Sequence, residues 1–120
     1  MRTVIKVETP AEFFKRGKAI ARLADQGKAI PREHIIAFED PADMARLITT
    51  AKLALFREVR LQPGSITELS ERLHRDRSAV KRDIDELEKA GLIEVEELPH
   101  PGHGRKKEVR AVAAQVLLAI

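Results

Sequence analysis

Two closely spaced helix-start signals, followed by two alternating segments, constrain the fold of this chain most strongly. Ser65-Ile66-Thr67-Glu68 has the form of a capping box and predicts a short helix. Asp76 is the expected cap of a second helix, which stops at Gly91. Residues 92–98 and 106–112 alternate apolar and polar side chains on either side of the turn-forming sequence PHPGHG. This order of elements predicts a helix-turn-helix with a β-hairpin wing.

The second helix of this pair has one apolar face and one face that suits DNA. Val80, Ile84 and Leu87 share a face and are predicted to pack on the core. Ser78 and Arg82 each lie about 200° around the helix from Val80, so they point outward. The start of such a helix enters the DNA major groove, where arginine can bind guanine and serine a base or a phosphate. The expected DNA-binding residues are Arg75, Arg77, Ser78, Lys81 and Arg82 near this helix, and Arg105, Lys106 and Lys107 beside the hairpin turn.

Basic and acidic side chains separate sharply along the second helix. Residues 72–82 carry five Lys or Arg against one acid, whereas the charged residues among 83–97 are all acidic apart from Lys89. A surface that is merely solvated more often mixes the two signs, which favours nucleic-acid contact by the basic part. Two alternatives stay open: Lys81–Asp85 and Arg82–Glu86 pairs that stabilise the helix, and pairing of the hairpin cations with glutamates across the strands.

A family resemblance lies in the same stretch. Residues 65–93, with paired leucines in the short helix, then RDRSAV, then DELEKAGLI, resemble the winged helix-turn-helix of MarR-like transcription regulators. The preceding HIIAFEDPADMARLIT resembles a smaller prokaryotic group of these regulators, some of them antitoxin-like. The resemblance implies sequence-specific binding of double-stranded DNA by a homodimer, often with autoregulation. The chain lacks the long terminal helices through which MarR proteins dimerise, so the N-terminal segment is the expected interface.

The acidic residues 83–97 support a rival interpretation. A winged helix can serve as a protein-interaction module, for example one that binds a toxin partner, because a fold does not specify its function. The acidic segment would then be the contact surface, and the chain would not read DNA directly.

The rest of the chain predicts an α+β fold with a small N-terminal β-α-β extension. Residues 3–8 and 34–39 read as strands, and Thr9-Pro10-Ala11-Glu12 starts a helix between them. An apolar stripe from Met44 to Val59 predicts helix, and Thr49 and Thr50 leave open whether it is one helix or two. The expected domains are residues 1–40, a β-α-β segment for dimerisation, residues 41–112, the DNA-binding winged helix, and residues 113–120, an apolar tail for which strand is slightly preferred.

Composition excludes several classes of site. The 120 residues include no cysteine, which rules out disulfides, thiolate metal sites and a cysteine nucleophile. No apolar run approaches the ~20 residues of a membrane helix, and Lys6 and Glu8 interrupt the N-terminal stretch, so we expect a cytoplasmic protein without membrane contact. His100 and His103 have a spacing seen in metal ligands, but no further ligands converge on them. We therefore expect no metal, no cofactor and no enzymatic activity.

Overall fold

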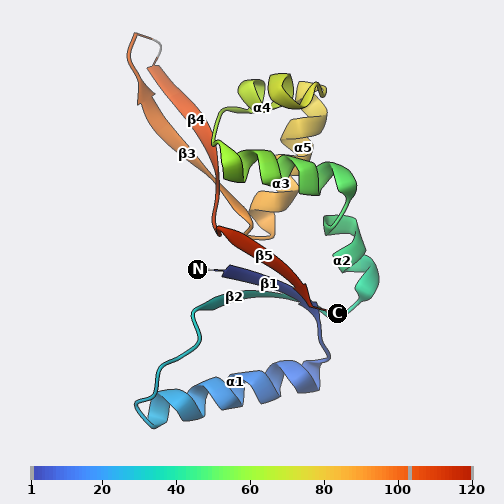
Figure 1. The fold of residues 1–120 in the computed structure, drawn as a ribbon, viewed down its shortest axis with the longest axis vertical. Coiled ribbons are helices and arrows are strands. Elements are labelled where there is room, and N and C mark those ends of the chain that lie inside the picture. Colours follow the sequence, from blue (N-terminus) through green and yellow to red (C-terminus); the bar gives the residue numbers. More distant parts are fainter. Residues whose placement is uncertain (1, 103, 120) are drawn as a thin grey trace. The chain divides into compact units, whose positions relative to one another are not determined.

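The computed structural model describes residues 2–102 and 104–119, which form helices and small sheets (Figure 1). Contacts divide the chain into two compact units, residues 1–45 with 115–120 and residues 46–114. No helix in the described part of the chain is long and apolar enough to cross a bilayer. Along the chain the elements are β1 (Arg2–Val7), α1 (Pro10–Asp25), β2 (Glu33–Phe38), α2 (Pro41–Leu47), α3 (Thr50–Leu61), α4 (Ile66–Leu73), α5 (Arg77–Lys89), β3 (Ile93–His100), β4 (Gly104–Ala111) and β5 (Gln115–Ala119).

The first unit contains a three-stranded parallel sheet in the order β2-β1-β5. Val4 in the central strand lies opposite Ile35 on one side and Leu117 on the other. Thr9 caps α1, because its hydroxyl accepts from the backbone N–H of Glu12 at 3.1 Å. The predicted β-α-β extension is therefore present, and it has a third strand that comes from the other end of the chain.

The C-terminal residues differ from the expected division of the chain. Residues 115–119 form the strand β5, in line with the slight preference for strand, but they belong with the N-terminal unit and not to a separate tail at 113–120. The physical reason is pairing: β5 completes the backbone hydrogen bonds along one edge of β1, a partner that lies more than a hundred residues away in sequence. Such a distant partner leaves no trace in the local pattern of side chains.

The second unit is built on α3, α4, α5 and the antiparallel hairpin of β3 and β4. Thr49 caps α3 through its hydroxyl, which accepts from the backbone N–H of Lys52 at 3.2 Å, so the stripe from Met44 to Val59 is divided between two helices. The side chains that form the core of this unit are apolar and almost fully buried: Leu55, Val59, Leu69, Val80, Ile84, Leu87, Ile93 and Val109. The predicted α+β winged helix-turn-helix is confirmed.

A short bridge fixes the hairpin to the helices. The backbone N–H of Val109 donates to the Gly64 carbonyl at 2.7 Å, and the Gly64 N–H donates in return at 3.3 Å. A Cβ atom at Gly64 would lie 2.2 Å from Arg72 Nη2. Glycine therefore lets the loop before α4 run directly between β4 and the Arg72 guanidinium.

Candidate nucleic-acid interface

The turn between α4 and α5 has well-defined backbone geometry. The Ser65 hydroxyl accepts from the Glu68 N–H at 3.1 Å and the Glu68 carboxylate accepts from the Ser65 N–H at 3.2 Å, which completes the predicted capping box. His74 adopts the left-handed conformation with φ 52° and ends α4. Asp76 then caps α5 by accepting from the Ala79 N–H at 3.2 Å. The start of α5 is thus held at a fixed angle to α4.

The inner face of α5 anchors the helix to the rest of its unit. Val80, Ile84 and Leu87 are at most 2% exposed, as the sequence predicts. On the flank of this face the buried Lys52 Nζ of α3 lies 2.5 Å from a Glu86 carboxylate oxygen. Hydrophobic burial and this ion pair therefore fix which side of α5 is left for a partner.

The outward side of α5 presents Ser78, Lys81 and Arg82, which are all exposed. Lys81 pairs with Asp85 at 2.9 Å, so one of the two alternative helix pairs is formed. The other is not, because Glu86 is engaged by Lys52. Within residues 2–102 and 104–119, Arg82 forms no hydrogen bond or ion pair. Arg82 is therefore a solvated cation with all five of its donors available.

Arg77 lies beside this group, and its Nε donates to the Thr67 hydroxyl at 3.2 Å. Both side chains are exposed, so the contact joins the starts of α4 and α5 at the surface. A residue of the first helix of a helix-turn-helix lies close to the DNA backbone when the second helix is in the groove. Sequence reasoning missed Thr67, although its place inside the capping box of α4 was a usable signal.

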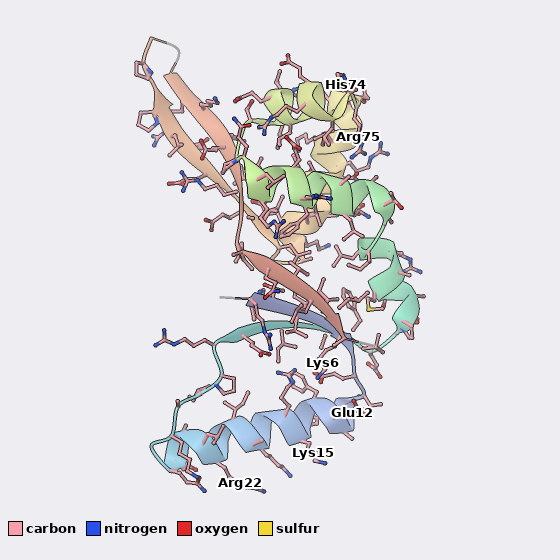
Figure 2. All side chains as sticks on the ribbon, viewed as in Figure 1. Lys6, Glu12, Lys15, Arg22, His74 and Arg75 are labelled. Carbon is pink, nitrogen blue, oxygen red and sulfur yellow. The ribbon has the colours of Figure 1, made fainter. Side chains whose placement is uncertain are left out.

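Arg75 is directed differently from the other candidates. Its Nη2 lies 2.7 Å from Asp83 Oδ2, and the two side chains are only 26% and 16% exposed. Its Nη1 is buried without a hydrogen-bond partner among the described residues. Figure 2 shows His74 and Arg75 together at the turn between α4 and α5. This guanidinium therefore braces the turn against α5, and a contact with DNA stays a prediction for it.

The hairpin cations have three different environments. Lys106 Nζ lies 2.6 Å from Glu68 Oε1 in the first turn of α4, which joins the hairpin to the helix pair. Arg105 forms a long, exposed pair with Glu97 at 3.7 Å, so the predicted cross-strand alternative is present for this residue. Lys107 is exposed and makes no ion pair in the described part of the chain.

Glu68 is the acid near this surface whose pKa is shifted most. Its hydrogen bond with Lys106, followed by those with Ser65, lowers the pKa of Glu68 from 4.5 to about 2. Sequence reasoning treated Glu68 only as a capping residue and missed its second role in holding the hairpin. No local pattern could have shown that contact, because Lys106 lies in a different element.

Two histidines of the hairpin turn have the spacing of metal ligands. His103 of the His100–His103 pair lies outside the described residues. Among those that the structure describes, no group of three His, Cys, Asp or Glu side chains is placed to hold a metal ion. The candidate surface consists of the exposed face of α5, the start of α4 and the cationic hairpin.

The HVO_A0114 family matches residues 47–116, which is more than half of the chain. The chain belongs to the HVO_A0114 family. The part matched by HVO_A0114 contains α3, α4, α5 and the hairpin, and therefore the whole of the candidate surface. No curated protein is similar enough to this chain to count as a match.

Several solved structures resemble this chain at low sequence identity. A protein described as a possible transcriptional regulator from Methanosarcina mazei Go1 is 19% identical, with a TM-score of 0.50 over 60% of this chain and 62% of its own. Apo MarR from E. coli is 20% identical with a TM-score of 0.48, over 88% of this chain and 67% of its own. A MarR-like regulator from Thermotoga maritima is 22% identical with a TM-score of 0.47, over 88% and 66%.

The chain thus spans roughly two thirds of the length of these proteins. At such identities the likeness concerns the fold. The similar structures include MarR-like regulators, the group that the sequence resembles, and the likeness to the Methanosarcina mazei protein concerns the fold alone.

Proposed function

We propose that this chain is a sequence-specific, double-stranded DNA-binding transcription regulator. The observation that carries the proposal is the outward face of α5, where Ser78 and Arg82 are exposed on a helix whose opposite face is buried. Arg82 has no intramolecular partner among the described residues, so a duplex would not have to displace one. The fold is shared with a protein described as a possible transcriptional regulator, which favours this role over catalysis.

Each candidate residue has a distinct part in this proposal. Arg82 and Ser78 read base edges in the major groove, while Arg77 and Lys81 contact phosphates on either side. The Lys81–Asp85 pair is more than half exposed at both side chains, so it costs little to open. Arg105 and Lys107 hold the backbone beside the groove, and Lys106 does so to the extent that Glu68 releases it.

We also propose that the chain acts as a homodimer through its first unit. Figure 2 shows Lys15 and Arg22 on α1, and the same helix leaves a stripe of apolar and small side chains exposed. This stripe consists of Phe13, Phe14, Gly17, Ala21 and Ala24. A symmetric dimer would bind two half-sites ~34–36 Å apart, or a multiple of that distance. Action as a repressor or an antitoxin-like autoregulator is the finer form of the proposal.

Binding of the full chain to duplex DNA tests the proposal directly. Unbiased selection from a random pool of duplexes should enrich one motif, and fluorescence anisotropy on that motif should show a strong loss of affinity between ~50 and 200 mM salt. A protein that enriches no motif and binds no duplex at low salt would contradict the proposal.

The rival function as a protein-interaction module is favoured by one observation. Glu88 and Glu94 are exposed and form no salt bridge within the described part of the chain, so an acidic surface is also available. A stable complex with a neighbouring gene product such as a toxin, together with no duplex binding at low salt, would favour this rival. Persistence of duplex binding would favour the regulator.

A further inference from the structure

The outward face of α5 carries an acid as well as cations. Ser78, Lys81, Arg82 and Asp85 have the offsets 0, 3, 4 and 7, which place them on one side of a helix. Asp85 lies within about 20° of Ser78 around the helix axis, and its side chain is 58% exposed. The same offsets separate the four residues with which homeodomain recognition helices read the major groove. Asp85 is therefore positioned on the reading face of α5.

The other nearby acids of α5 are held by the protein itself. Asp83 pairs with Arg75 at 2.7 Å, and Glu86 pairs with Lys52 at 2.5 Å. Both contacts draw the carboxylate towards side chains outside α5. Asp85 instead pairs within the exposed face, with Lys81 Nζ at 2.9 Å from its Oδ2. No hydrogen bond to Asp85 Oδ1 is present among the described residues, so this oxygen can accept from a partner.

We infer that Asp85 is a specificity-determining residue that accepts a hydrogen bond from the exocyclic amine of a cytosine. This inference rests on the proposed function. An ionised carboxylate only accepts hydrogen bonds, and it repels phosphate. On a helix face that enters a duplex, Asp85 therefore weakens binding to every sequence that does not offer an amine at its position. In the major groove cytosine presents its N4 amine, whereas guanine and thymine present acceptors that repel a carboxylate.

Adenine fits the Asp85 carboxylate less well than cytosine. Its N6 amine lies beside the N7 acceptor, so a carboxylate placed there gains one hydrogen bond and meets one repulsive lone pair. Asparagine has both a donor and an acceptor and matches that edge of adenine. The identity of residue 85 should therefore decide which base is preferred at one position of the site, next to the base pair that Arg82 reads.

Selection from a random duplex pool, repeated with variants, tests this inference. We expect wild-type protein to prefer cytosine at one position by about tenfold, which corresponds to one good contact. D85A should lose that preference and bind random duplex more tightly, because a repulsive charge is gone. D85N should move the preference at the same position from cytosine to adenine. Thermal melting of each variant checks that the exposed substitution leaves the fold intact.

Glu88→Gln is the matched control, because it removes one negative charge from an exposed position of α5 away from the reading face. It should raise affinity slightly for all sequences and leave every base preference unchanged. If D85A and D85N behave as E88Q does, Asp85 is only a repulsive charge and the inference is wrong. In that case the Arg82-dependent motif would survive, whereas failure of wild-type protein to bind any duplex would overturn the proposed function as well.

Discussion

Lys106 Nζ in the hairpin lies 2.6 Å from Glu68 Oε1 in the first turn of α4. The same carboxylate oxygen accepts from the Ser65 backbone N–H, so one acid both caps the helix and holds the hairpin. The contact joins two parts of the proposed DNA-binding surface. It also engages one of the three hairpin cations, so Lys106 has to leave Glu68 before it can bind a phosphate.

Acid should weaken this junction. Because the pKa of Glu68 is lowered from 4.5 to about 2 in the folded protein, its carboxylate stabilises the fold above pH 4.5. That contribution is lost progressively as the pH falls from about 4.5 towards 2. Urea unfolding measured at several pH values should show the decline. The variant E68Q should show a shallower decline in the free energy of unfolding. An equal decline in both proteins would show that Glu68 is not its source.

Release of Lys106 should strengthen DNA binding. E68Q keeps an amide oxygen for the Ser65 cap but removes the negative charge, so Lys106 becomes free for a phosphate. We expect higher affinity for all duplexes and a salt dependence of log K steeper by about one unit. In a K106A background, the change of Glu68 to Gln should have little effect on DNA affinity. A double-mutant cycle of the two positions gives the coupling energy between them. Unchanged salt dependence in E68Q would show that Lys106 does not reach the backbone.

Substitutions of Arg82 and Lys107 should affect DNA binding in two different ways. Loss of a base-reading arginine in R82A should cost about 1–3 kcal/mol of binding free energy and relax the sequence preference at one position. K107A should weaken binding to all sequences alike and reduce the salt slope by about one. Anisotropy titrations with the selected site and with its single-base variants separate the two effects. An R82A protein with unchanged affinity and preference would remove Arg82 from the reading face.

Arg75 is expected to support the fold more than the DNA contact. R75A leaves the part-buried carboxylate of Asp83 without its partner, so we expect a loss of about 1–3 kcal/mol in the free energy of unfolding. D83N removes the charge of the other partner in this pair. The double variant should lose less free energy of unfolding than the sum of the two single losses. A reduced salt slope for R75A, with unchanged stability, would instead show a direct phosphate contact.

Gly17 offers a test of the proposed dimer. A Cβ atom there meets nothing within 4 Å in the protomer, so G17A should stabilise α1 by about 1 kcal/mol through helix propensity. G17L places a bulky side chain in the middle of the exposed apolar stripe and should dissociate a dimer that packs through it. Sedimentation velocity at several concentrations measures the outcome. Dimers that persist in G17L, with unchanged affinity, would place the interface elsewhere.

Local signals in the sequence account for most of the helices. Ser65, Asp76 and Thr9 cap helices where they were expected to, because a cap depends on side chains within three residues of the helix start. The buried face of α5 also follows from the spacing of Val80, Ile84 and Leu87. The division between α2 and α3 could not be decided from the sequence, since two threonines in succession were both suitable caps.

Pairings between distant side chains could not be predicted in the same way. The sequence left open a pair between Glu86 and Arg82 one helical turn away, but Glu86 pairs with the buried Lys52 of α3 instead. Arg82 is left free for that reason. Asp83 similarly engages Arg75, which separates this arginine from the cations that face outward.

The sequence by itself determined where each helix of the winged unit begins, which face of α5 is apolar and which residues are cationic. The tertiary structure decided which of those cations keep their charge available, and that β5 pairs with β1. The reason is the range of the forces involved. Capping and helical periodicity act within a few residues, whereas ion pairs and strand pairing depend on elements that only folding brings into contact.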